Sequence, residues 1–144
     1  MSPIDLESAS PAEIYEAVAV IEEDEFERMM ERPEQRQRVI DALVDHMVGL
    51  FRAEQAEGID ARIHLKLWDR PGGGYDHFEL RIADGACELG EPRADPDLTL
   101  KVRPTDLRKL LTGETGARRL ALKGRLRAIG DLGLGMKLPD LFSF

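Results

Sequence analysis

The chain has 144 residues, of which 42% are hydrophobic, and this is enough for one domain with a substantial core. A net charge of −8 argues against a nucleic-acid partner, and no apolar run approaches the roughly 18 residues that a membrane-spanning helix needs. The N-terminus is acidic where a signal peptide is basic and then apolar, so we expect a cytoplasmic protein.

The charge is unevenly distributed along the chain. The first 60 residues carry 16 acidic and 5 basic side chains, and the remainder carry 12 and 15. We interpret the acidic first part of the chain as a solvated helical surface that aids solubility, in preference to a charged patch that recruits a partner. Asparagine is absent and arginine outnumbers lysine 15 to 5, a bias that fits a high-GC or heat-adapted prokaryote.

The first predicted helix begins at Ser10. A serine N-cap followed by Pro11 and by Glu13 three residues after the cap is typical of a helix start. An apolar stripe at helical spacing follows, and Pro33 interrupts the pattern. We interpret residues 1–32 as an N-terminal helical extension, either a hairpin that packs on the domain or a dimerisation arm.

Residues 34–57 show a broad apolar face at helical spacing, which predicts one long helix ended by Gly58. His46 lies beside this face, and we interpret it as a boundary residue without a chemical role. The apolar positions are Val39, Ile40, Leu43, Val44, Met47, Val48, Leu50 and Phe51.

Alternating apolar and polar residues then predict four strands, around residues 63–67, 78–82, 87–89 and 98–102. Turns are expected at residues 71–74 and 84–85. Because each strand is apolar on one side only, helices should cover one face of the sheet and water the other. Trp68 falls on the polar face, where it could contact the extension or a second subunit. Cys87 is expected to be a small buried apolar residue.

The last third predicts a helix from Thr105 to Gly113, a strand at residues 125–128 and a terminal helix capped by Asp131. Apolar residues surround nearly the whole circumference of this terminal helix, which is more than a single core-facing stripe requires. Part of that surface must meet a ligand, a partner or a second layer.

The segments DLTLKV, TDLRKLLTG, ALKG and GRLRAIGDLGLGMKL, together with their spacing, resemble the sterol carrier protein 2 family of intracellular lipid-binding domains. The resemblance is most specific at Thr112-Gly113 and at residues 124–138, and it extends back to about Pro33. It implies an α+β fold, with a five-stranded, mostly antiparallel sheet covered on one face by helices. Residues 33–144 would form the lipid-binding domain.

The resemblance also implies non-catalytic binding or transfer of a lipid, such as a sterol, a fatty acid, an acyl-CoA or another long apolar molecule, in a hydrophobic tunnel between sheet and C-terminal helices. Composition alone favours an ordinary filled core. The residues expected to line the tunnel are Leu100, Val102, Leu107, Leu111, Leu122, Leu126, Leu134, Met136, Leu138 and Phe142.

Two positions depart from the family pattern. Ala121 and Leu122 stand where many relatives carry bulky aromatic residues, and Gly135 occupies a helix position at a cost of about 1 kcal/mol relative to alanine. Both departures suggest a roomier or looser cavity mouth. The chain also ends without the Ser-Lys-Leu type of peroxisomal signal that some relatives carry.

No motif of the sequence predicts an enzyme, a cofactor or a metal site. The segment PGGGYD lacks the Gly-Lys-Ser/Thr ending of a phosphate loop, and no Gly-x-Ser-x-Gly elbow is present. His46, His64 and His77 lack zinc-ligand spacing, although His64 and His77 could approach one another across the first hairpin. The alternative to a lipid carrier is a subunit-interaction or dimerisation module of a larger enzyme system, which implies a homodimer or a protein partner.

Overall fold

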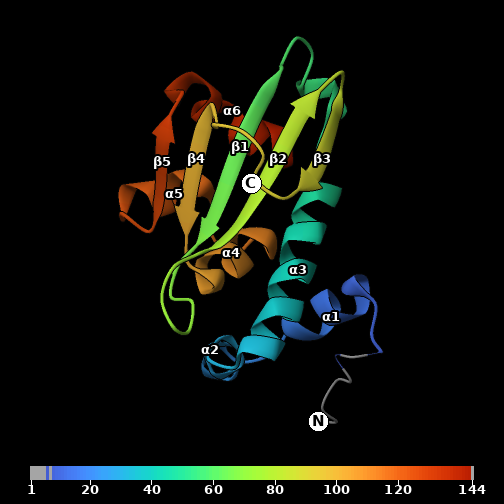
Figure 1. Ribbon diagram of the computed structural model, residues 1–144, viewed down its shortest axis with the longest axis vertical. Coiled ribbons are helices and arrows are strands. Elements are labelled where there is room, and N and C mark those ends of the chain that lie inside the picture. Colours follow the sequence, from blue (N-terminus) through green and yellow to red (C-terminus); the bar gives the residue numbers. More distant parts are fainter. Residues whose placement is uncertain (1–5, 7, 144) are drawn as a thin grey trace.

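The computed structural model describes residue 6 and residues 8–143, so the first residues of the predicted extension lie outside the described part (Figure 1). Five strands form one sheet in the order β3-β2-β1-β4-β5. β1 and β4 are parallel, and the other neighbouring pairs are antiparallel. The predicted five-stranded, mostly antiparallel sheet is therefore confirmed. The strands are β1 (Ala61–Leu67), β2 (Asp76–Ala83), β3 (Ala86–Gly90), β4 (Leu98–Val102) and β5 (Leu126–Gly130).

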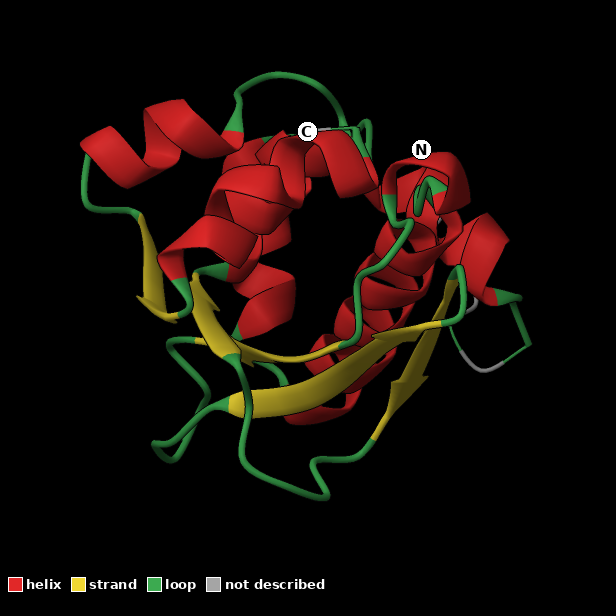
Figure 2. Ribbon diagram, turned by 90° about the horizontal axis from the view of Figure 1, so that it is seen from above, coloured by secondary structure: helices red, strands yellow, loops and turns green. Residues whose placement is uncertain are grey.

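The helices gather on one side of the sheet (Figure 2). The longest of them runs behind β2 and β3, and two short helices pack at its N-terminal end (Figure 1). The α+β class expected from the sequence is thus confirmed. The helices are α1 (Pro11–Val18), α2 (Glu23–Met30), α3 (Pro33–Gly49), η1 (Ala53–Gln55), α4 (Pro104–Leu111), α5 (Ala117–Leu122) and α6 (Leu132–Phe142).

The predicted long helix is shorter than expected, because α3 ends at Gly49 and not near residue 57. Beyond it the half-buried Phe51 turns toward α6, and its ring centroid lies 5.7 Å from that of Phe142. The backbone N–H of Arg52 then donates to the carbonyl of Leu141 at 2.8 Å. The side chain of Phe51 therefore contacts the C-terminal helix and does not extend the face of α3.

The core lies between the sheet and the helices, as the one-sided pattern of the strands requires. Ile63, Leu65 and Leu67 on the inner face of β1 are at most 1% exposed, and Phe26 and Phe142 are fully buried. Each such side chain contributes roughly 1.5 to 3 kcal/mol relative to an exposed one.

The N-terminal helices pack into this core. Val18 and Phe26 are at most 1% exposed. The Arg108 side chain of α4 donates to the carbonyls of Val18 at 3.0 Å and Ile21 at 2.8 Å, and its guanidinium lies 4.6 Å from the centre of the Phe26 ring. Arg108 therefore joins the segment that contains α1 and α2 to the rest of the fold.

A buried ion pair fixes the start of α3 against the sheet. Arg36 is 2% exposed and Asp76 is 8% exposed, and the two side chains approach to 2.7 Å. The remaining guanidinium hydrogens are donated to the carbonyls of Met30, Asp69 and Trp68, at 3.3, 3.1 and 2.7 Å. One arginine thus connects α2, α3, the start of β2 and the connection that follows β1.

We expect Arg36→Ala to lower the free energy of unfolding by about 3 to 5 kcal/mol, because it leaves the Asp76 carboxylate buried without its partner. Arg38→Ala, two residues along the same helix, removes an exposed arginine and should change stability by less than about 1 kcal/mol. Urea denaturation of both variants measures the difference. Equal midpoints would show that the pair contributes nothing to stability.

Candidate functional site

Eight of the ten residues predicted to line a tunnel meet in one apolar layer between the sheet and the helices. Seven of them are at most 9% exposed, and Leu126 is half-buried against the same core. Strands β4 and β5 supply one side of the layer, and helices α4 and α6 supply the other. The eight residues are Leu100, Val102, Leu107, Leu111, Leu126, Leu134, Leu138 and Phe142.

The other two predicted residues do not join this layer. Met136 is 77% exposed, because Leu134 and Leu138 face the core and a residue midway between them on a helix points away from it. Leu122 is 85% exposed at the end of α5, whose buried positions are Ala117 and Leu120. The sequence pattern did not separate these outward-facing residues from the inward-facing ones.

Four pockets of the described residues have other linings. They lie near α1, α2, α4 and η1, and none of the ten predicted residues lines any of them. In this conformation the apolar layer is thus not part of any of these pockets.

The α6 helix covers the layer at β4 and β5. Asp131 caps the helix by accepting a hydrogen bond from the Leu134 N–H at 3.1 Å. A Cβ at Gly135 would lie 3.8 Å from the Ala128 side chain, which shows how closely the helix approaches β5. Pro139 lies inside α6 and cannot donate the helical hydrogen bond to the carbonyl of Gly135.

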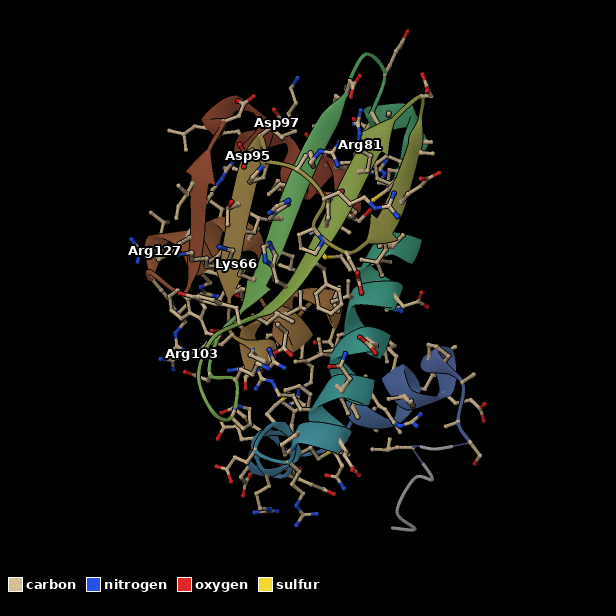
Figure 3. All side chains as sticks on the ribbon, viewed as in Figure 1. Lys66, Arg81, Asp95, Asp97, Arg103 and Arg127 are labelled. Carbon is tan, nitrogen blue, oxygen red and sulfur yellow. The ribbon has the colours of Figure 1, made fainter. Side chains whose placement is uncertain are left out.

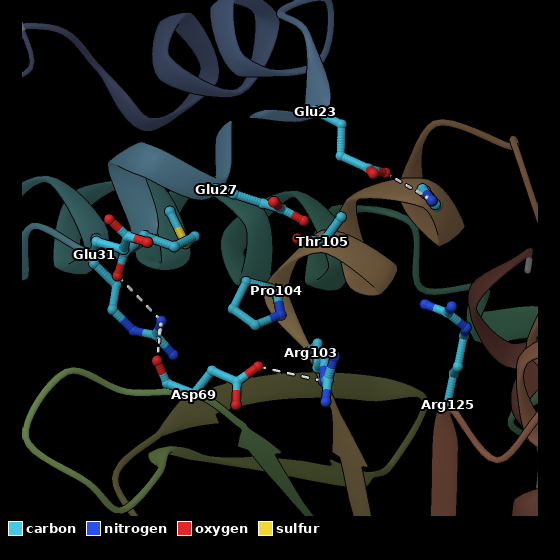
Figure 4. A pocket seen from close by; sticks show the side chains of 11 residues that line it. Glu23, Glu27, Glu31, Asp69, Arg103, Pro104, Thr105 and Arg125 are labelled. Carbon is cyan, nitrogen blue, oxygen red and sulfur yellow. Dashed lines mark hydrogen bonds and ion pairs between the residues drawn. The ribbon is translucent and has the colours of Figure 1, made fainter. Parts of the chain in front are cut away.

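The largest of the four pockets measures about 500 Å³ and is polar (Figure 4). It lies between α2, the start of α4 and the connection from β1 to β2. Ion pairs cross it, from Lys109 to Glu23 at 2.8 Å and from Arg103 to Asp69 at 3.3 Å. Since both signs of charge are interspersed along its walls, the pocket favours neither an anionic nor a cationic ligand.

A chain of hydrogen bonds occupies the opposite face of the sheet. The Nε2 of His77 lies 2.9 Å from the Nδ1 of His64, as expected for a cross-strand pair, and the Nε2 of His64 lies 3.2 Å from Glu79. Glu79, 5% exposed, also accepts from Arg62 at 2.7 Å and from the Arg93 backbone at 3.1 Å. Sequence reasoning missed Glu79 and Arg62, because their positions depend on the strand register.

These groups determine the ionisation of Glu79. Burial raises the pKa of Glu79, but the Arg93 N–H, the His64 ring and the Arg62 guanidinium outweigh this effect and lower the pKa to about 2. For His77 the direction is the opposite one for burial, because burial disfavours the charged imidazole and lowers its pKa. The neighbouring His64 and Lys66 lower this pKa further. Among the described residues, no three histidine, cysteine or acidic side chains are arranged to hold a metal ion.

The two remaining candidates from the sequence have structural roles. His46 stacks on Tyr15 with ring centroids 3.6 Å apart, and burial lowers its pKa. Cys87 packs against the core, and burial together with Glu88 raises the pKa of its thiol to about 11. A thiol of that pKa is almost entirely protonated at neutral pH and is a poor nucleophile.

Comparison with known proteins decides the family. The model of the SCP-2 sterol transfer family matches residues 49–143. The chain belongs to this family. Sterol carrier protein 2 of Oryctolagus cuniculus is 30% identical over 79 residues, which is 54% of this chain and 14% of that relative. The chain therefore spans only a small part of the relative's length.

Solved structures of SCP-2 proteins and of an enzyme share the fold. A crystal structure of sterol carrier protein 2 like 2 from Aedes aegypti has a TM-score of 0.53 at 14% identity, covering 71% of this chain and 94% of that one. Palmitated SCP2L2 from the same species gives 0.55 at 16% identity, over 71% and 92%. The sec-alkylsulfatase Pisa1 from Pseudomonas sp. gives 0.57 at 19% identity, over 72% of this chain and 16% of the enzyme.

The depressed pKa of Glu79 predicts a pH dependence of stability. A carboxyl group whose pKa falls from 4.5 to about 2 on folding stabilises the protein above pH 4.5, and this stabilisation is lost as the pH falls toward 2. We expect Glu79→Gln to lower the urea midpoint at neutral pH and to reduce the loss of stability on acidification. Glu88→Gln, at an exposed position of β3, is the control and should behave like the wild type. Parallel pH profiles for all three proteins would contradict the proposed role of Glu79.

Proposed function

We propose that this protein binds or transfers a lipid without catalysing a reaction. The observation that carries the proposal is the apolar layer of eight residues between the sheet and the helices α4 and α6, in a chain of the SCP-2 family. The palmitated neighbour from Aedes aegypti makes a long-chain fatty acid the first ligand to test. A sterol, an acyl-CoA or another long apolar molecule fits the same chemistry. The proposed compartment is the cytoplasm, and no described helix has the length and hydrophobicity to span a bilayer.

The chemistry of the layer suits an acyl chain. Each methylene group transferred from water into an apolar site contributes about 0.8 kcal/mol, so a chain of about a dozen carbons can bind with no specific polar contact. Selectivity would then depend mainly on length and shape. The eight buried residues form the proposed wall, and we place Leu122 and Met136 at its rim, where they would contact a ligand during entry.

We infer that a covering element moves when a ligand enters, because the residues of the layer are buried or half-buried between the sheet and the helices. We assign this movement to α6. It contains Gly133, Gly135 and Pro139, each of which lowers helix stability, and elements that open for ligands are generally the less stable ones. A hydrophobic ligand beneath the helix would take over the apolar packing that the opening of α6 disrupts.

We propose that the lipid-binding domain comprises residues 33–144 and that residues 1–32 are an N-terminal extension, whose helices α1 and α2 pack on it. The boundary falls between α2 and α3. The buried Val18 and Phe26 and the hydrogen bonds from Arg108 give the extension a part in stabilising the core.

The second candidate function is a subunit-interaction module, with a homodimer or an enzyme as partner. It is favoured by the fold similarity to a region covering 16% of the sulfatase Pisa1, in which such a domain is one part of a larger enzyme. The exposed Leu122, Leu132 and Met136 could serve such an interface. Native mass spectrometry distinguishes the two, because a carrier retains lipid and a module is an empty oligomer.

We expect palmitate to protect the backbone amides of residues 131–142 from hydrogen exchange. Protection should grow with palmitate concentration relative to its dissociation constant, because a ligand that binds only the closed state stabilises it by mass action. Exchange measured with and without palmitate tests this. The movable-cover hypothesis fails if these amides are already as protected in the empty protein as those around Leu100 in β4.

Gly135→Ala should slow palmitate uptake by up to about fivefold, since alanine stabilises a helix by about 1 kcal/mol relative to glycine. The added methyl group meets its nearest neighbours at ordinary contact distances of 3.8 and 3.9 Å, so no clash opposes the gain. Gly49→Ala, at the end of α3 with no neighbour within 4 Å, is the matched control. Stopped-flow uptake of a fluorescent fatty acid should separate the variants. Equal rates would show that opening of α6 does not limit entry.

A further inference from the structure

A row of basic side chains crosses the solvent-facing side of the sheet. His77 of β2 lies opposite Lys66 of β1, Lys66 lies beside Lys101 of β4, and Lys101 lies opposite Arg127 of β5. Residues paired across neighbouring strands point to the same face. We call these four residues the basic row.

In the part of the chain that the structure describes, the three permanent charges of the basic row have no acidic partner. Among the described residues, no carboxylate lies within ion-pair distance of Lys66, Lys101 or Arg127, although the chain carries 28 acidic residues. The two lysines instead lie 5.5 and 5.3 Å from the centre of the Tyr75 ring. Like charges on neighbouring strands destabilise a sheet. The row is therefore an electrostatic cost of the fold that an anionic partner would offset.

Charge is also separated along this face. Lys66 and Arg127 lie at one level of the sheet with Arg103 close by, whereas Asp95 and Asp97 lie toward the opposite end (Figure 3). The Asp97 carboxylate accepts the backbone N–H of Arg62 at 2.8 Å, and Glu79 is held by Arg62 and His64. Glu79 also reaches His77 of the row through His64, and Asp69 pairs with Arg103. These acids are therefore engaged by other bases, which leaves the positive charge of Lys66, Lys101 and Arg127 uncompensated.

The shape of this region favours a surface as partner over a small ligand. Four strands spaced about 4.8 Å apart spread the row over roughly 14 Å, which is wider than one phosphate group. None of the four pockets includes Lys66, Lys101 or Arg127. Ile129, which follows the row on the same face of β5, is 48% exposed and offers an apolar contact.

We propose that the basic row docks the protein on a bilayer that contains anionic phospholipids, with the phosphate-bearing headgroups as its partners. Lysine and arginine side chains near such a surface are attracted to its negative potential, and the attraction weakens as salt screens it. The biological purpose of docking rests on the proposed function, because a carrier has to reach the membrane that holds its cargo. The charge arrangement of the basic row does not depend on the proposed function.

The test is sedimentation with vesicles of phosphatidylcholine alone or mixed with phosphatidylserine. The wild type should bind the mixed vesicles, and added salt should weaken the binding. Replacing Lys66, Lys101 and Arg127 together by glutamine should weaken binding on the order of a hundredfold, at about fivefold for each charge. The matched control replaces Arg118, Arg119 and Lys123 of the α5 region by glutamine. This control variant loses the same three positive charges, and its affinity for the mixed vesicles should stay within about threefold of the wild-type value.

Two further measurements keep the result unambiguous. Thermal unfolding should show that the Lys66→Gln/Lys101→Gln/Arg127→Gln variant is at least as stable as the wild type, since like charges are removed. Palmitate binding in vesicle-free buffer tests the lipid-binding function separately, and the same variant should retain it. If the wild type fails to bind palmitate, the proposed binding of a long-chain fatty acid is refuted, and the vesicle result still decides the docking.

The docking proposal is wrong if a folded row variant sediments like the wild type, or if the α5 control loses as much binding. It is also wrong if the wild type binds neutral and anionic vesicles equally. Pyrophosphate binding in solution that the row substitutions abolish, without any vesicle binding, would identify a small-ligand site in place of a docking surface.

Discussion

The whole arrangement depends on a sheet that is apolar on one face only. The central strand β1 buries Ile63, Leu65 and Leu67 on the inner side, and it directs Lys66 to the outer side. The helices must cover the inner face, because an apolar sheet surface left in water would not be stable. The same alternation that creates the apolar layer beneath α6 therefore also creates the basic row on the opposite face.

The connection between β3 and β4 determines how much of the outer face remains open. It crosses in front of β2 and β1 and reaches the N-terminal end of β1, where β4 begins. β4 therefore runs parallel to β1 (Figure 1). Along this path the Arg93 N–H binds Glu79, and Asp97 pairs with the backbone of Arg62 in both directions. One end of the outer face is thus covered and neutralised, and the other end stays basic, with the half-buried Lys66 and Lys101 beside the exposed Arg127.

The sequence pattern was sufficient to predict the strands, the covered face and most of the apolar layer, because alternation and helical spacing directly report which side is buried. It could not predict the register of the first hairpin. A turn centred on residues 71–74 would pair His64 with Arg81, whereas the longer connection pairs it with Glu79. Nor could it predict that Met136 faces water, because α6 is apolar all round and tertiary contacts alone select the inner side.

The two ends of α6 are held with unequal strength, and this limits how the helix can open. At its C-terminal end Leu141 and Phe142 are fully buried, and the Leu141 carbonyl accepts the Arg52 N–H. The N-terminal half contains Gly133 and Gly135 and lies over the edge strand β5, whose own residues are largely exposed. Detaching the whole helix would expose two large core side chains, so opening costs least if the N-terminal half lifts and the chain bends near Pro139. In the opening that we propose, the anchored end would preserve the core while Leu134 and the rest of the N-terminal half move away from the sheet.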